Sequence, residues 1–155
     1  MNKIPSLTAI ILTYNEEIHL QRCLDSLKGV AKEIVVIDSF STDSTQQIAE
    51  YNGAYFLQNP WVNHSLQFNW GLDNSAVTSD WLLRIDADEY LTPELQQEIK
   101  DNLSQMNSEV SGIEIPLKRV FLNRHIKRGL GEIRILRIFR KDKARLESRW
   151  MDEHM

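Results

Sequence analysis

Three carboxylates within four positions, Asp86, Asp88 and Glu89, are the residues of this 155-residue chain whose types and spacing most suggest chemistry. They directly follow residues 81–85, an apolar run with the length of a short buried strand. Side chains two positions apart in an extended segment point the same way, so we expect Asp86 and Asp88 to face one ligand. Two hard oxygen donors suit Mn²⁺ or Mg²⁺, which would also take oxygens from a substrate phosphate.

The same carboxylates are also typical of an acidic turn that closes a strand and precedes a helix. Residues 92–94, Thr-Pro-Glu, have the pattern of such a helix start. Taken alone, the motif favours the acidic turn, whereas the polar residues at the other strand ends favour the metal site.

The predicted elements alternate between strands and helices. The pattern indicates a Rossmann-like, wound, mostly parallel α/β sheet flanked by helices. Asn15 is expected to cap the first helix, and Ser41 or Thr42 the second. The last strand alternates apolar residues with arginines, which predicts one basic face. The expected strands are 7–12, 33–38, 54–57, 81–85, 112–116 and 133–139.

Polar residues follow three of these strands, and ligands of wound sheets bind at the carboxyl ends of strands. Tyr14 and Glu16 follow the first strand, and Asp38 ends the second. Asp38 can accept from an N–H of a nucleobase, and Tyr14 can stack on its ring. The alternatives are a helix cap for Asp38 and a packed aromatic for Tyr14. No glycine-rich phosphate loop follows the first strand, so a metal is the expected device for holding phosphates.

Taken together, the motifs resemble the family 2 glycosyltransferases with the GT-A fold, which use nucleotide-activated sugars. The similarity is greatest to the branch with lipopolysaccharide-core glucosyltransferase-like proteins. The resemblance implies transfer of a sugar, with UDP-sugar as the favoured donor, to a hydroxyl of a glycan or glycolipid acceptor. The segments that carry it are 11–17, 33–38, 41–45, 67–72 and 81–91.

The resemblance also implies a role for individual positions. Tyr14 and Glu16 would line the base pocket, and Asp38 would recognise the base. Asp86 would lie near the ribose and the metal, and Asp88 would ligate the Mn²⁺ or Mg²⁺ that bridges the diphosphate. Many members have a second aspartate directly after Asp38, whereas this chain has a serine there.

Sugar transfer with inversion needs a general base for the acceptor hydroxyl. The tail after Trp150 supplies the candidates. Similarity to related sequences selects Glu153, with Asp152 as the second choice; His154 is a further candidate metal ligand. Relatives usually continue beyond this motif, so we expect the chain to be a fragment of a longer protein.

The length predicts a single domain. The resemblance implies that this domain is the catalytic core over residues 1–155, with a nucleotide-sugar part at 1–116 and an acceptor-side part at 117–155. The second part holds 12 of the 18 Lys and Arg but five of the 22 Asp and Glu, a net charge of +7 against −11 for the first. The basic 118–149 segment therefore suggests peripheral membrane contact. Nucleic acid is not expected as a partner, because the whole chain is acidic.

The single cysteine, Cys23, and the lack of a signal-peptide pattern suggest a cytoplasmic protein, with the inner face of the membrane as a candidate place of action. Two other functions compete with sugar transfer. One is a catalytically silent nucleotide-sugar-binding module. The other is a nucleotidyltransferase, which would require a glycine-rich, basic loop after the first strand.

Overall fold

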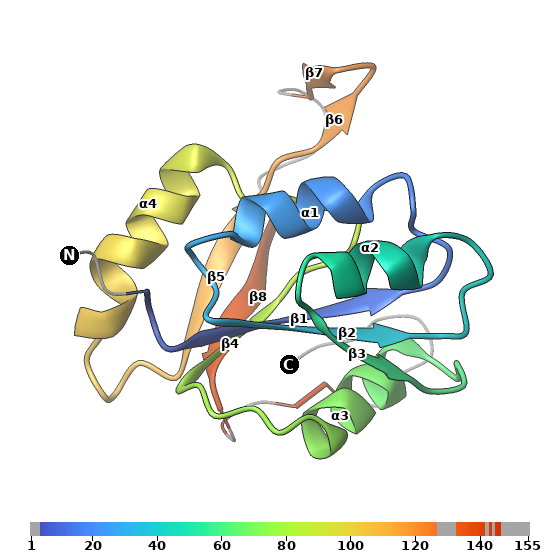
Figure 1. Cartoon of the computed structure of the whole chain (residues 1–155). Helices are drawn as coiled ribbons and strands as arrows, with labels where there is room; N and C mark the ends of the chain where they lie inside the picture. The colour runs from blue at the N-terminus through green and yellow to red at the C-terminus, as the bar shows by residue number, and fades with distance from the viewer. Residues whose placement is uncertain (1–3, 127–132, 142, 144, 147–155) are drawn as a thin grey trace.

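The computed structural model describes residues 4–126, 133–141, 143 and 145–146. Its centre is a six-stranded sheet with helices on both faces (Figure 1). This architecture confirms the predicted wound α/β fold. In spatial order the strands are β3 (Tyr55–Gln58), β2 (Glu33–Asp38), β1 (Leu7–Thr13), β4 (Trp81–Arg84), β8 (Ile133–Arg140) and β5 (Gly112–Leu117).

Strand direction decides which loops share an edge of the sheet. The first four strands in spatial order are mutually parallel, with Thr13 of β1 opposite Asp38 of β2. Strand β8 runs antiparallel to β4, and β5 runs antiparallel to β8. Strand β5 is consequently parallel to β4, and it ends at the same edge of the sheet as β1, β2 and β4.

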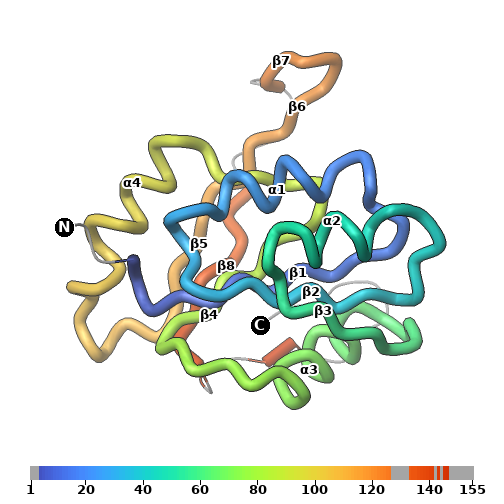
Figure 2. Tube along the Cα trace, in the orientation of Figure 1, coloured from blue at the N-terminus to red at the C-terminus, as the bar shows by residue number. Residues whose placement is uncertain are grey.

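The helices are distributed unevenly over the two faces of the sheet (Figures 1 and 2). Three cover one face: α1 (Leu20–Leu27), α2 (Thr45–Tyr51) and α4 (Pro93–Asn102), which continues into η1 (Leu103–Gln105). Helix α3 (His64–Asn74) covers the other face. Among the described helices, none combines the length and apolarity that a bilayer span requires.

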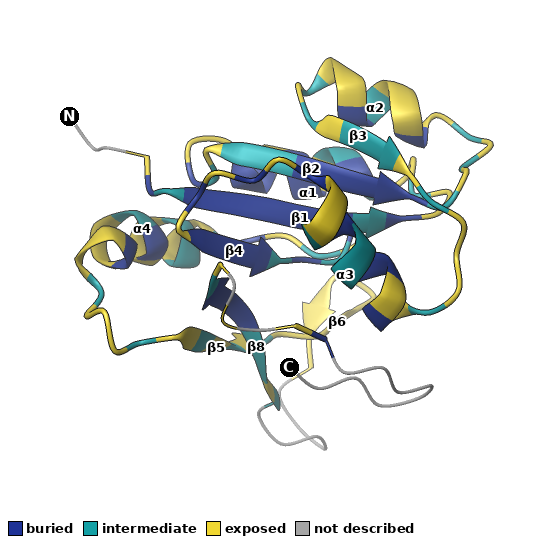
Figure 3. Ribbon diagram, turned by 90° about the horizontal axis from the view of Figure 1, so that it is seen from below, coloured by how far each residue is buried: buried dark blue, intermediate teal, exposed yellow. Residues whose placement is uncertain are grey.

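Side chains of the central strands alternate between two apolar cores, one on each face of the sheet. Leu7, Ala9 and Ile11 of β1 join the core under α1, whereas Ile10 joins Phe68 of α3 on the opposite face. Both faces of β1 are therefore buried, as its continuous apolar run predicts (Figure 3).

Helix α3 packs closely on the sheet because it has a glycine where it faces β2. A Cβ at Gly71 would lie 1.7 Å from Cδ1 of Ile37, so the isoleucine occupies the space that any other side chain would need. The close approach places Gln67, one turn earlier on α3, next to the loop after β2, where its Nε2 donates to Oγ of Ser39 at 3.1 Å.

The predicted strands agree with the structure to within two residues, but two predicted helix caps are wrong. Helix α1 begins at Leu20 rather than just after Asn15, which has a positive φ of 52°. Helix α2 begins at Thr45, so neither Ser41 nor Thr42 caps it. These residues instead bond to partners in a neighbouring loop or strand end, and long-range bonds of this kind leave no trace in local sequence.

A short hairpin stands outside the main sheet. Strands β6 (Val120–Phe121) and β7 (Arg124–His125) pair only with each other in the described sheets. The hairpin follows β5 and projects from the body of the molecule (Figure 1).

Candidate functional site

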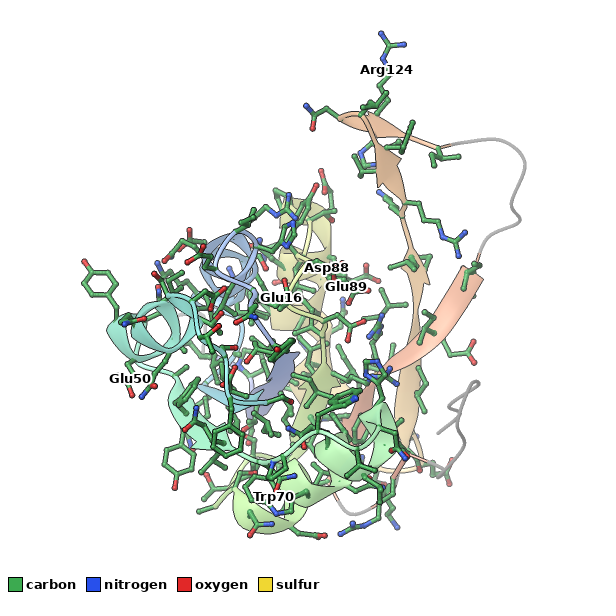
Figure 4. The ribbon with its side chains drawn as sticks, turned by 90° about the vertical axis from the view of Figure 1, so that its right-hand side faces the viewer. Glu16, Glu50, Trp70, Asp88, Glu89 and Arg124 are labelled. Carbon is green, nitrogen blue, oxygen red and sulfur yellow. The ribbon has the colours of Figure 1, made fainter. Side chains whose placement is uncertain are left out.

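The candidate site lies at the edge of the sheet where β1, β2 and β4 end. The parallel register brings the loops after these strands to this one edge. Asp38 and Asp88 thus lie on the same edge of the fold, as the sequence predicted. Figure 4 views this edge and shows Glu16, Asp88 and Glu89 toward its middle, with Glu50 and Trp70 nearer its periphery.

The loops after β1 and β2 are bonded to each other rather than only to themselves. The backbone N–H of Asn15 donates to Oγ of Ser41 at 2.8 Å, and the N–H of Thr42 donates to Oδ1 of Asn15 at 2.9 Å. Glu17 receives a bond from the N–H of Ser44 at 3.0 Å. Helix-capping side chains often accept bonds from backbone N–H groups of this kind. Here side-chain oxygens of the opposite loop accept them instead. The two loops therefore form one connected rim.

The buried carboxylate of Asp38 stabilises this rim through hydrogen bonds. Its carboxylate is fully buried and accepts four hydrogen bonds: from Oγ1 of Thr13 at 2.7 Å, from N and Oγ of Ser41 at 2.7 and 2.5 Å, and from Nε2 of Gln58 at 3.3 Å. Two carboxylate oxygens have about four acceptor sites, so these donors saturate Asp38. Contact between Asp38 and a nucleobase would require one of the four to move.

The importance of these hydrogen bonds can be tested at Thr13, which is buried and donates to Asp38. We expect Thr13→Val, which keeps the shape and removes the hydroxyl, to lower the free energy of unfolding by about 1–2 kcal/mol. Urea denaturation measures the change. Thr42→Val is the matched control, because Thr42 is exposed, and it should change stability by less than about 0.5 kcal/mol. Equal effects of the two substitutions would contradict the stabilising role of Asp38.

Two exposed aromatic side chains flank the bonded part of the rim. Tyr14 precedes Asn15 and is 60% exposed, and Phe40 precedes Ser41 and is 52% exposed. Phe40 has a φ of 60°, which is unfavourable for a bulky side chain and typical of positions where function outweighs strain. Phe40 was not among the residues predicted from sequence, although a lone aromatic inside a serine- and threonine-rich turn was a visible signal.

Glu16 lies at the entry to α1. Its backbone N–H donates to Oγ1 of Thr45, and its carboxylate lies 3.1 Å from Nδ1 of His19. The half-buried side chain belongs to the same rim as Tyr14, which is where the sequence placed it.

Asp86, Asp88 and Glu89 lie in a turn rather than in an extended segment. Strand β4 ends at Arg84, and the N–H of Glu89 donates to the carbonyl oxygen of Asp86 at 3.0 Å. The prediction relied on the alternation of side chains along a strand, and this argument is wrong because Asp86 and Asp88 lie beyond the end of β4. Both carboxylates are nevertheless accessible, since Asp88 is exposed and the Asp86 side chain is 41% exposed, and the charges of both act on the Glu89 carboxyl.

Arg137 balances the charge of this turn. Its Nη2 lies 2.6 Å from Oε1 of Glu89 and 3.7 Å from Oδ2 of Asp86, and its side chain is 9% exposed. The position of Arg137 comes from a β-bulge. Ile113 of β5 pairs with Ile138, but the next residue of β5 pairs with Leu136, so Arg137 is the additional residue of β8. Bulges next to functional sites often redirect a side chain in this way.

The arginines of β8 do not form the single basic face that the sequence predicted. Arg137 is buried against Glu89, whereas Arg140 lies 4.2 Å over the ring of Trp81 and donates to the carbonyl oxygen of Val110. The bulge breaks the alternation on which the prediction relied. The sequence offered one signal that Arg137 is a buried ion-pair partner, namely a charged residue between the apolar residues Leu136 and Ile138.

Burial sets the electrostatics of the turn. Burial raises the pKa of the Glu89 carboxyl, Arg137 opposes this shift, and the charge of Asp86 adds to it. The Cys23 thiol of α1 lies 3.7 Å from the carbonyl oxygen of Asp86, and burial, with the three nearby carboxylates, raises its pKa to about 12. Cys23 is therefore an unreactive packing residue.

A divalent ion fits the chemistry of the turn. Asp86 and Asp88 offer accessible hard oxygen donors, and Mg²⁺ or Mn²⁺ is commonly held by one or two carboxylates together with waters and substrate phosphates. No cluster of three or more His, Cys, Asp or Glu suited to a metal is present within the described ranges. The donor set thus matches an ion shared with a phosphate ligand better than a closed protein cage. Glu153, Asp152 and His154 lie outside the described residues.

The site is thus an acidic turn beside a rim with exposed aromatics, at the carboxyl edge of an α/β sheet where ligands of wound sheets bind. The model of the family "Glycosyl transferase family 2" matches residues 8–150. The chain belongs to this family of glycosyltransferases, which confirms the resemblance stated above.

Individual relatives agree with this assignment. The lipopolysaccharide core biosynthesis glycosyltransferase LpsC of Rhizobium meliloti is 32% identical over 151 residues, which cover 94% of this chain and 54% of LpsC. An uncharacterized glycosyltransferase of Rickettsia bellii is 39% identical over 103 residues, which cover 66% of this chain and 34% of that protein. The chain thus spans from about a third to about half of the length of these relatives.

Among solved structures, the mannosyltransferase PcManGT of Pyrobaculum calidifontis, in complex with GDP-Man and Mn²⁺, has the same fold. The TM-score is 0.57 with 21% sequence identity, over 76% of this chain and 36% of that one.

Proposed function

We propose that this chain is the core of an inverting, metal-dependent glycosyltransferase that moves a sugar from a nucleotide-diphosphate sugar to a hydroxyl of a glycan or glycolipid. UDP-sugars are the favoured donors. In this proposal residues 1–116 bind the donor and residues 117–155 face the acceptor. The similarity to LpsC supports a place in bacterial lipopolysaccharide or cell-surface polysaccharide synthesis. The proposed location is the inner face of the membrane.

The observation that carries the proposal is the position of the acidic turn. Asp86 and Asp88 are accessible at the edge where the rim after β1 and β2 presents Tyr14 and Phe40. A nucleoside diphosphate has an aromatic base at one end and a doubly charged pyrophosphate at the other. Aromatic side chains for stacking and carboxylates for a shared ion match those two ends.

Each residue has a part in the proposed reaction. Tyr14, Phe40 and Glu16 bind and orient the nucleoside, and Asp86 and Asp88 hold Mn²⁺ or Mg²⁺. When bound, the ion supplies positive charge against the departing diphosphate. Glu153, with Asp152 as the alternative, takes the proton of the acceptor hydroxyl as the oxygen attacks the anomeric carbon. PcManGT, which has the same fold, binds a donor and an ion of the kinds proposed here.

The metal site can be tested at Asp88. We expect Asp88→Asn to weaken Mn²⁺-dependent UDP binding at least about 10-fold, because it removes a charged oxygen ligand. Calorimetric titration of UDP with and without Mn²⁺ measures the effect. Asp101→Asn, an exposed carboxylate on α4, is the matched control and should bind as the wild type does.

The outcomes separate the alternatives. Unchanged UDP binding by Asp88→Asn would reject the metal site. Wild-type protein that binds UDP with Mn²⁺ but never turns over a UDP-sugar with any acceptor would be a silent binding module. The loop after β1 contains no glycine between Thr13 and Leu20, which argues against a nucleotidyltransferase because that chemistry calls for a flexible, glycine-rich phosphate loop.

A further inference from the structure

The β6–β7 hairpin carries apolar side chains into solvent. Val120, Phe121, Leu122 and Ile126 are all exposed, with Phe121 at 66% and Leu122 at 81%. Figure 3 shows β6 as exposed along its visible length. Burying such residues in the core would have been favourable, so a cluster of four on one projecting element marks an interaction surface.

The hairpin is a defined structure rather than a loose loop. Val120 pairs with His125 and Phe121 with Arg124, and the N–H of Ile126 donates to the carbonyl oxygen of Arg119 at 3.0 Å. The two residues at the tip, Leu122 and Asn123, both have positive φ, which is the geometry of a tight type I′ turn. A leucine at such a position is unfavourable, so its presence at the tip requires another benefit.

The charge of the hairpin has a single sign. Residues 115–131 contain five Lys and Arg and no Asp or Glu, although the chain as a whole is acidic. Arg119 lies just before β6, and Arg124 in β7 is labelled at the far end of the hairpin in Figure 4. Apolar side chains at the tip among basic residues are complementary to a lipid surface, where hydrocarbon lies beneath anionic headgroups.

We propose that the β6–β7 hairpin docks this protein on an anionic phospholipid surface, with Phe121 and Leu122 inserted between headgroups and Arg119 and Arg124 paired with phosphates. A second copy of the chain fits less well, because two such hairpins packed symmetrically would bring like charges together. Nucleic acid fits less well because aliphatic side chains, rather than stacking rings, occupy most of the tip.

The topology gives the docking a consequence for the site. The hairpin follows β5, and β5 ends at the same edge of the sheet as the strands that carry Asp38 and the acidic turn. A membrane bound by the hairpin would thus lie beyond the end of β5, one of the strands that end at this edge. The inference rests on the membrane location in the proposed function and names the element that makes the contact, and vesicle binding tests it without any transfer reaction.

Vesicle flotation of the 155-residue chain provides the test. We expect binding to vesicles of phosphatidylcholine mixed with phosphatidylglycerol, and little binding to phosphatidylcholine alone. Arg119→Gln combined with Arg124→Gln should lower the partition coefficient roughly 20- to 30-fold, since each basic residue near an anionic surface contributes about a factor of five. Phe121→Ser combined with Leu122→Asn should lower it at least about 10-fold; asparagine tolerates the positive φ of the turn.

Matched controls exclude general effects of charge and exposure. Lys28→Gln with Lys32→Gln removes two exposed charges from the body, and Tyr51→Ser removes an aromatic that is 89% exposed. Both control proteins should bind vesicles as the wild type does. All variants should unfold at the wild-type temperature, because the hairpin lies outside the apolar cores.

A fluorophore reports insertion directly. Cys23 is buried, so a polarity-sensitive thiol label will attach to Leu122→Cys and leave the wild type unlabelled. Its emission should shift to the blue on anionic vesicles, whereas a label on Tyr51→Cys should not respond. The proposal is overturned if the hairpin variants bind vesicles like the wild type, if uncharged vesicles bind equally well, or if the hairpin variants only convert a dimer into a monomer.

Discussion

Replacing Arg137 by methionine is expected to lower the free energy of unfolding by about 3–5 kcal/mol. The guanidinium is the close partner of Glu89, which is itself largely buried, and Asp86 lies within 3.7 Å of the same nitrogen. Without Arg137, the partly buried carboxylates of Glu89 and Asp86 would lose the cation that compensates their charge. Urea denaturation of the wild type and Arg137→Met measures the loss.

Two further variants identify the cause. Arg134→Met changes an exposed arginine on the same strand, so its effect should stay within about 0.5 kcal/mol. Glu89→Gln combined with Arg137→Met removes both charges, and we expect the double variant to be more stable than Arg137→Met alone. A double variant less stable than the single one would show that packing, rather than charge balance, makes Arg137 important.

Arg137 also has a functional consequence if the acidic turn binds an ion. Nη1 of Arg137 has no hydrogen-bond partner among the described residues, although it is buried. Because the bond from Nη2 fixes Glu89, and Glu89 accepts from the N–H of Asp86 at 3.1 Å, the arginine acts on the site as a positioning residue. Its loss should therefore weaken Mn²⁺-dependent UDP binding as well as stability.

Replacing Glu153 by glutamine is expected to lower sugar transfer roughly 100- to 10,000-fold while UDP binding with Mn²⁺ stays unchanged. The amide keeps the size of the side chain but cannot accept the proton of the acceptor hydroxyl. Release of UDP from a UDP-sugar in the presence of glycolipid acceptors measures transfer, and calorimetry measures binding.

Asp152→Asn is the matched comparison, since it makes the same chemical change at the neighbouring position. We expect a smaller effect from it. A large loss with Asp152→Asn and none with Glu153→Gln would move the general base to Asp152. Full transfer by both variants would place the base elsewhere in the protein.

The buried strands were the part of the fold most accessible from sequence. Strand β2 has the predicted bounds, 33–38, because a continuous apolar run flanked by polar residues has one favourable placement in a sheet. The starts of α1 and α2 were not accessible. They depend on bonds between Asn15 and Thr42 and between Ser41 and Asp38, which form only after the strands have brought distant residues together.

The candidate site, like the fold, could be predicted from sequence only in part. Type and spacing identified Asp38 and Asp88, and the sheet places both at one edge. Asp38 proved to be saturated with hydrogen bonds, a property that depends on donors up to 25 positions away in the chain. Arg137 escaped notice because its environment follows from a change of register between β5 and β8, which no local pattern encodes.

The bulge also implies that β5 and β8 could pair without a residue at position 137. Without the extra residue, Leu136 and Ile138 would still oppose consecutive residues of β5, and the ladder would become regular. The extra residue in β8 is therefore the means by which the backbone brings a positive charge to the acidic turn.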